Sequence, residues 1–320
     1  MIDNLLLEEQ SMYDANEIDF DRHWKDVITD FLDSFLQLLE PTLFEKIDFS
    51  FHPKSMEQEL YPLSTKQKKG KNIADKIFEV ILKDQEKSVA NIHIEVQGDG
   101  QDISERMFKT YYKLYDQHKK NIYSIVLVTH PSAEQTSLFY HNFFGTSILF
   151  YFHVHHLNDF SESELLHLNN PFALALLAGQ YHAQTRTDVE MRYIYKIKLT
   201  ELIRKKYPLD EGDTGINLLK FVDTILYLPE DLREKYIQEV FQIFVKEGID
   251  LTKAEKTKEV ITFGELLERW KEEGREEGQL IEKQNIARKM AMEGMEFEAI
   301  ISLTGLSEGE VKRLMQENQS

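Results

Sequence analysis

The sequence predicts an α/β fold in which a sheet flanked by helices comes first, followed by a helical region and a charged helical tail. Three observations carry this prediction. Strand-like alternation of apolar and polar residues is confined to residues 75–155, apolar residues at helical spacing precede it and dominate from residue 170 onward, and charge dominates after residue 261. We therefore expect a core at residues 20–160, a helical region at 161–260 and a charged tail at 261–320.

The first predicted element is an amphipathic helix over residues 20–39. Trp24, Ile28, Phe31 and Phe35 recur there at helical spacing, and Pro41 follows the run. The sequence therefore predicts that a helix precedes the sheet.

Two strands follow, at residues 75–82 and 89–97. Alternation is cleaner in the second, where the apolar residues 92, 94 and 96 share one face. The polar side chains on its other face are those of His93, Glu95 and Gln97. This strand therefore aligns three polar groups on one side of the sheet.

The rest of the core is predicted as a helix at residues 103–118 and strands at 121–129 and 147–155. The run Ile125-Val126-Leu127-Val128 is typical of a buried strand. The expected order is helix, strand, strand, helix, strand, strand.

The second half is predicted to be helical, with periodic segments at residues 172–180, 192–204, 216–227 and 232–244. Residues 263–294 read as a long charged helix that Gly294 can end. A short helix at 297–303 follows, and Ser307 with Glu310 forms a capping box for a last helix. This terminal pair resembles a helix-turn-helix, which serves DNA binding or contacts between protein copies.

The composition excludes several kinds of site. None of the 320 residues is cysteine, so a disulfide framework, a thiolate metal site and a cysteine nucleophile are excluded. The acidic first residues carry no basic region before an apolar run, and no stretch is long and apolar enough to span a membrane. We expect a cytoplasmic protein with no membrane partner.

The net charge of −18 opposes broad electrostatic binding to nucleic acid, because a duplex repels an acidic surface. Basic residues nevertheless gather around position 75. They are Lys66, Lys68, Lys69, Lys71 and Lys76. This cluster is either a solvated loop or a contact to phosphate, for which Lys69 and Lys71 are the candidates.

Asp75 and Glu95 are the candidate metal ligands. If Asp75 opens one strand and Glu95 lies on the same face of its neighbour, their carboxylates converge on one side of the sheet. Oxygen ligands of this kind suit Mg²⁺, with Mn²⁺ as a substitute, and the Val96 carbonyl could add a further ligand. Gln97, two residues along the strand from Glu95, projects to the same face and could reach the attacking water or a phosphate oxygen.

The run ADKIFEVILKDQEKSVANIHIEVQG, with the following SERMFKTYYKLYD and IYSIVLVTH, resembles the Rpn family of recombination-promoting nucleases (YhgA-like putative transposases), a branch of the PD-(D/E)XK nucleases. The segment NPFALALLAGQYHAQT and the tail extend the resemblance over most of residues 20–316. It implies a restriction-endonuclease-like mixed sheet, with Asp75 and Glu95 as metal ligands. Gln97 stands where the broader superfamily usually has lysine. The superfamily also carries an acidic residue on or after its first helix, for which Glu59 is the candidate and Glu57 the rival.

Further candidates each have a simpler alternative. His93 could be a third ligand or a base, or only a hydrogen-bonded strand residue. Arg106 could bind phosphate, or pair with a nearby acid such as Asp102.

A group of tyrosines and a group of histidines are both interpreted as structural. Tyr111, Tyr112 and Tyr115 could stack on bases, but their helical spacing favours packing against the sheet. His153, His155 and His156 suggest zinc, but the sequence shows no matching pair of carboxylates beside them.

The sequence thus predicts a Mg²⁺-dependent DNA endonuclease of low sequence specificity, linked to recombination or mobile elements. One alternative is an inactive protein that keeps the nuclease fold for assembly or DNA tethering. Another is a phosphoesterase acting on RNA or nucleotides. Self-association through the C-terminal helices is also expected.

Overall fold

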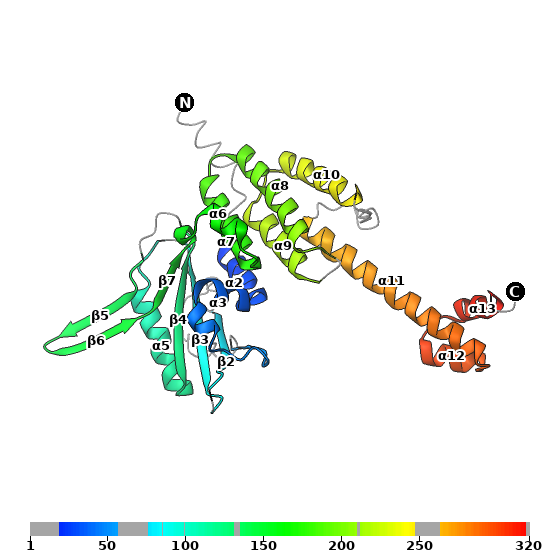
Figure 1. Ribbon diagram of the computed structural model, residues 1–320, viewed down its shortest axis with the longest axis horizontal. Coiled ribbons are helices and arrows are strands. Elements are labelled where there is room, and N and C mark those ends of the chain that lie inside the picture. The colour runs from blue at the N-terminus through cyan, green and yellow to red at the C-terminus, as the bar shows by residue number, and fades with distance from the viewer. Residues whose placement is uncertain are drawn as a thin grey trace, which may run out of the picture. The chain divides into compact units, whose positions relative to one another are not determined.

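The computed structural model describes residues 19–56, 76–84, 86–98, 100–130, 135–209, 212–246 and 263–317. The chain divides into two compact units, Met1–Val240 and Phe241–Ser320. The predicted boundaries at residues 160 and 260 stay predictions. The first unit contains the sheet (Figure 1).

The main sheet has five strands in the order β1-β2-β3-β4-β7. Their bounds are Lys54–Ser55 (β1), Lys76–Ile81 (β2), Val89–Gln97 (β3), Asn121–Val128 (β4) and His153–His156 (β7). β1, β2 and β3 pair antiparallel, whereas β3, β4 and β7 pair parallel. The predicted mixed sheet flanked by helices is confirmed.

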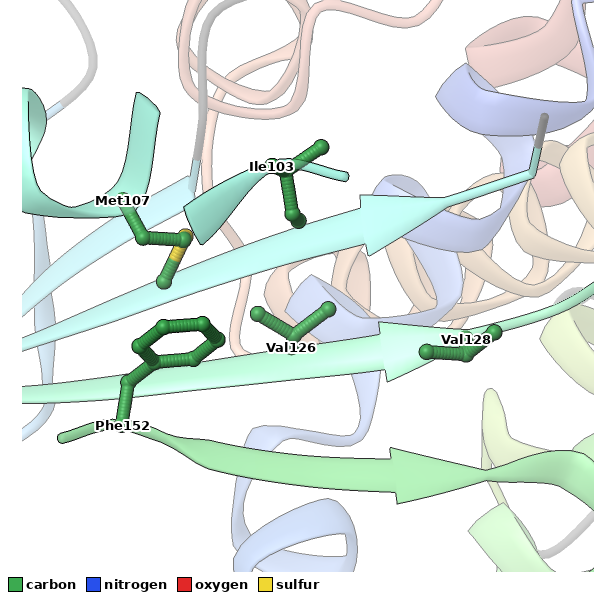
Figure 2. Close-up of a cluster of buried hydrophobic side chains, with 5 residues drawn as sticks. All are labelled: Ile103, Met107, Val126, Val128 and Phe152. Atoms are coloured by element: carbon green, nitrogen blue, oxygen red, sulfur yellow. The ribbon is translucent and has the colours of Figure 1, made fainter. Parts of the chain in front are cut away.

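Helix α5 (Ser104–His118) covers one face of this sheet. Its side chains Ile103, at the N-cap, and Met107 pack with Val126 and Val128 of β4 and with Phe152, as Figure 2 shows. Its Leu114 packs with Ile77 of β2. The predicted helix at 103–118 therefore lies directly over the central strands.

Helices α2 (Phe20–Asp30) and α3 (Leu32–Leu39) lie toward the other face, where Lys76 of β2 pairs with Asp26 at 3.9 Å. The helix predicted over residues 20–39 is confirmed with an interruption at Phe31, whose φ of −126° and ψ of 38° are not helical. Pro41 begins a further short helix, α4 (Pro41–Phe44), because its missing N–H is not needed in a first turn.

The strand predicted at residues 147–155 is wrong in one respect, because it is two strands in different sheets. β6 (Thr146–Tyr151) pairs antiparallel with β5 (Leu138–Phe143), and only β7 joins the main sheet. The buried Phe152 separates them. Alternation continues across both strands, so periodicity alone could not reveal that the hydrogen-bonding partner changes.

The region after the sheet is helical where it is described, as its periodic segments predict, and it belongs to the first unit as far as Val240. Its helices are α6 (Glu162–His167), α7 (Pro171–Gln184), α8 (Val189–Lys206), α9 (Thr214–Ile225) and α10 (Glu230–Lys246), preceded by a 3₁₀ turn at Leu157–Asp159. Trp24 of α2 meets Phe172 of α7 and Phe221 of α9 edge-on, with ring centroids 6.4 and 4.9 Å away. Aromatic packing therefore joins this region to the helices beside the sheet.

The second unit contains α11 (Phe263–Met292), α12 (Phe297–Thr304) and α13 (Glu308–Glu317), as predicted. Ala287, Ile300, Leu306, Val311 and Leu314 form its buried core. The Ser307–Glu310 capping box is confirmed, since the Ser307 N–H donates to the Glu310 carboxylate at 2.9 Å. Within the described ranges, no helix combines the length and apolar character needed to cross a bilayer.

Candidate functional site

The polar face of β3 points toward α5. His93 lies opposite Ile77, which packs against α5, and side chains of directly paired residues share a face. Glu95 lies opposite Val126, which also packs against α5. The predicted common face of His93, Glu95 and Gln97 is therefore confirmed.

These three side chains are buried rather than exposed. His93 is 0% exposed, Glu95 3% and Gln97 4%. None of the three side chains faces solvent, because α5 covers this side of the sheet. A carboxylate so deeply buried requires a compensating charge.

Arg106 of α5 supplies that charge. Its Nη2 donates to Oε1 of Glu95 and, at 3.3 Å, to Oε1 of Gln97. The Gln97 amide in turn donates to the Gln101 carbonyl at 3.0 Å. Side-chain exposure is 51% for Arg106 but 4% for Glu95. The guanidinium of Arg106 thus lies between the buried Glu95 carboxylate and solvent.

The expected alternative partner of Arg106, Asp102, has a different role. Its carboxylate accepts a hydrogen bond from the Ser104 N–H at 2.9 Å, in the first turn of α5. That hydrogen bond lowers the pKa of Asp102 against the effect of burial. The alternative that Arg106 pairs with a nearby acid is therefore confirmed, but the acid is Glu95 and not Asp102, and phosphate binding by Arg106 stays a prediction.

The Val96 carbonyl points to the side of β3 away from β4. The next carbonyl, that of Gln97, accepts the Thr129 N–H at 2.9 Å on the β4 side, and successive carbonyls of a strand point to opposite sides. The described part of β2 begins at Lys76, opposite Ile94. The Val96 carbonyl therefore faces the β2 side of the sheet, and its role as a ligand stays a prediction.

Several predicted residues lie outside the described ranges. They are Asp75, Glu57, Glu59, Lys66, Lys68, Lys69 and Lys71, and their roles stay predictions. Lys76 is the one residue of the predicted lysine cluster that lies within the described ranges. It pairs with Asp26 on the α2 side of the sheet, so it does not lie on the face of Glu95.

The oxygen donors at this site fit a hard divalent cation. Glu95 offers a carboxylate and Val96 a carbonyl, both of a kind that Mg²⁺ accepts. In the part of the chain that the structure describes, no group of three His, Asp or Glu side chains is placed to hold a metal ion. The part of Asp75, which directly precedes Lys76 in the sequence, in such a site stays a prediction.

A second polar cluster lies on the α2 side of the sheet. Glu40, next to the end of α3, contacts three side chains from β4 and β7. His155 Nε2 lies 2.8 Å and His153 Nδ1 3.1 Å from Glu40 Oε1, while the Tyr123 hydroxyl donates to Oε2 at 2.6 Å. Sequence reasoning found no carboxylate for these histidines because Glu40 is 115 positions from His155.

The hydrogen bonds of Glu40 connect the end of α3 to strands β4 and β7, and they also control the pKa of its carboxyl group. Burial alone would raise the pKa of Glu40, but hydrogen bonds from His155 and Tyr123 and the charge of His153 hold that pKa below its usual range. Burial and the hydrogen bond to Glu40 raise the pKa of Tyr123. Glu40 is therefore held as a carboxylate.

The tyrosines of α5 differ from the expected core packing. Tyr112 is 59% and Tyr115 48% exposed, so the prediction of burial is wrong for both. Tyr111 stacks on Tyr115 with a centroid distance of 6.3 Å and also contacts Phe150. The exposed rings therefore lie on α5, the helix that also carries Arg106.

Comparison of the chain with models of protein families, with curated proteins and with solved structures finds no match.

Proposed function

We propose that the chain is a Mg²⁺-dependent DNA endonuclease of low sequence specificity, with a restriction-endonuclease-like core. The observation that carries this proposal is the buried Glu95 carboxylate, joined with Gln97 to the half-exposed guanidinium of Arg106. The resemblance to recombination-promoting nucleases supports DNA as the substrate and a cytoplasmic role linked to mobile elements.

Glu95 needs a positive partner whatever the state of the protein, because an isolated buried carboxylate is strongly unfavourable. Arg106 is this positive partner. Because its side chain is 51% exposed, the guanidinium can rotate into solvent without crossing a packed core. A guanidinium released in this way suits bidentate binding of a phosphate. We propose that Arg106 exchanges Glu95 for the phosphodiester when a cation is present.

Asp75, Glu95 and the Val96 carbonyl would hold the cation, with Mn²⁺ able to replace Mg²⁺. A bound divalent cation supplies a water of lowered pKa and a counter-charge for the developing oxyanion. Gln97 cannot carry the charge that lysine would, but its amide can orient a water or a phosphate oxygen. Its hydrogen bond to the Gln101 carbonyl already fixes the amide group.

The net charge of −18 requires local basic groups for any contact with DNA. Lys69 and Lys71, close in sequence to Asp75, and Arg106 are our candidates. Glu59 is the candidate for the further acidic residue. None of these roles requires a base-specific contact, in keeping with low sequence specificity.

The experiment is cleavage of supercoiled plasmid by the full chain with Mg²⁺, comparing the natural protein with Glu95→Gln and Asp75→Ala. We expect both variants to lose about 100-fold or more in rate. Glu105→Gln is the matched control, because Glu105 precedes Arg106 on α5 but has a side chain that is 65% exposed. The control is expected to cleave normally.

Calorimetric titration with Mn²⁺ provides a second readout. We expect one site in the natural protein and in Glu105→Gln, and none in Glu95→Gln. Equal residual nicking by all variants, without cation binding, would reject the enzyme and favour an inactive protein for assembly or DNA tethering. Preferential cleavage of RNA or nucleotides would instead identify a phosphoesterase that uses the same residues.

A further inference from the structure

The hairpin formed by β5 and β6 extends away from the main sheet (Figure 1). Its two-residue turn, Phe144-Gly145, has φ values of +45° and +88°, as a type I′ turn requires. Phenylalanine is unfavourable at such a position, where asparagine or glycine is usual. Phe144 is nevertheless 94% exposed at the tip.

The hairpin carries no charged residue. None of residues 138–151 is Asp, Glu, Lys or Arg, whereas 29% of the chain is charged. Exposed strands are usually protected from self-association by charged side chains, above all lysine. This hairpin lacks that protection.

The two faces of the hairpin have different surroundings. Phe139 and Phe150 lie opposite each other and both contact Phe108 of α5, with centroid distances of 4.9 and 5.9 Å. This face is anchored to the first unit. The alternate residues therefore lie on the face that points away from α5.

We call the exposed apolar residues of that second face the hairpin patch: Tyr140, Leu149 and Tyr151. Tyr140 and Leu149 are directly paired, and Tyr151 is paired with the half-buried Leu138. The patch residues are 57%, 56% and 69% exposed. Three neighbouring apolar side chains on one sheet face are thus left open to solvent.

We infer that the hairpin patch binds the same patch of a second copy of this chain, forming a twofold-symmetric dimer. With Phe144, the patch exposes roughly 500 Å² of side-chain surface, taking about 200 Å² for a whole aromatic side chain. That is more than half of the roughly 800 Å² that each partner contributes to a stable interface. Asn142 and Ser147, paired between the patch and the turn, add polar surface.

The uncharged hairpin argues against two other kinds of partner. A nucleic acid would require Lys or Arg on this surface, and residues 138–151 contain neither. An anionic membrane would require the same. Two copies that each carry a net charge of −18 repel one another overall, and contact through residues 138–151 brings no Asp or Glu of one copy against those of the other.

The test is the mass of the full chain in solution, measured by analytical ultracentrifugation at micromolar concentrations. We expect the natural protein to sediment as a dimer. Replacing Tyr140 and Leu149 together by lysine is expected to weaken the dimer by roughly 100-fold or more, giving monomers with unchanged circular dichroism. Tyr112→Lys is the matched control, because Tyr112 is equally exposed but lies on α5, and it is expected to remain dimeric.

Cross-linking gives an independent measurement, since the chain has no cysteine. Leu149→Cys is expected to form a covalent dimer with a short bis-maleimide, and Tyr112→Cys is not. A natural protein that is monomeric, a dimer that survives the double lysine substitution, or a monomer that binds phosphatidylcholine vesicles through the patch would each overturn the inference. None of these outcomes bears on plasmid cleavage, so the dimer and the nuclease are tested separately.

Discussion

Replacing Arg106 by glutamine tests the central physical argument about the site. The change removes the guanidinium that contacts Glu95 and leaves a shorter, uncharged polar side chain on α5. Breaking a fully buried ion pair by removing one partner costs about 3–5 kcal/mol, whereas an exposed pair is worth about 0–1 kcal/mol. Glu95 is 4% and Arg106 51% exposed, so the pair lies between these limits.

We therefore expect Arg106→Gln to lower the free energy of unfolding by about 2 kcal/mol in the presence of a chelator. For a unit of this size the melting temperature should fall by roughly 4–8 °C. Lys109→Gln is the matched control, because Lys109 pairs with Glu105 one turn along the same helix, with both side chains more than 60% exposed. It should cost no more than about 0.5 kcal/mol.

The assay is urea unfolding followed by circular dichroism, with chelator and then with Mg²⁺. A cation bound at Glu95 should restore stability to Arg106→Gln, by about 2.7 kcal/mol when Mg²⁺ exceeds its dissociation constant 100-fold. A loss no larger than that of Lys109→Gln would refute the compensation of charge by Arg106. If Arg106→Gln loses about 2 kcal/mol of unfolding free energy and Mg²⁺ does not restore it, cation binding at this position would be refuted.

Three further predictions concern the first unit. Burial, with Arg192 and Arg186 nearby, lowers the pKa of His182 to about 4 from 6.5. Its imidazole therefore stays neutral in the fold, so stability should fall by about 3 kcal/mol between pH 6.5 and pH 4, and His182→Phe should lose this part of the pH dependence in urea unfolding. Glu40→Gln should be less stable by about 2 kcal/mol at neutral pH, and the difference should vanish as the pH falls through the lowered pKa of Glu40, because the natural carboxylate is then protonated too. Gly179→Ala should cost about 1–3 kcal/mol, because the new Cβ would lie 2.6 Å from Cζ2 of the buried Trp24.

Each of these predictions has a result that would contradict it. A His182→Phe variant with the pH profile of the natural protein would show that another group controls acid stability. A Glu40→Gln deficit that persists at low pH would show that shape, not charge, holds the cluster. Gly274→Ala is the control for Gly179→Ala, since nothing lies within 4 Å of its Cβ, and it should stabilise α11 by about 1 kcal/mol.

Local pattern was sufficient for most elements of the fold. The alternation in residues 89–97 predicted β3 and the shared face of Glu95 and Gln97, because a strand places every second side chain on one side. The Ser307–Glu310 capping box was equally readable, since its hydrogen bonds span only three residues. Signals of this kind depend on neighbours in sequence.

The sequence by itself thus determined the mixed class of the fold, most of its helices and strands, and the common face of His93, Glu95 and Gln97. Tertiary structure alone decided that Arg106 pairs with Glu95, that Glu40 meets His153 and His155, and that the strand pattern after residue 146 divides between two sheets. The physical reason is that periodicity fixes the direction of a side chain within its own element. Which side chain it meets depends on how distant elements pack.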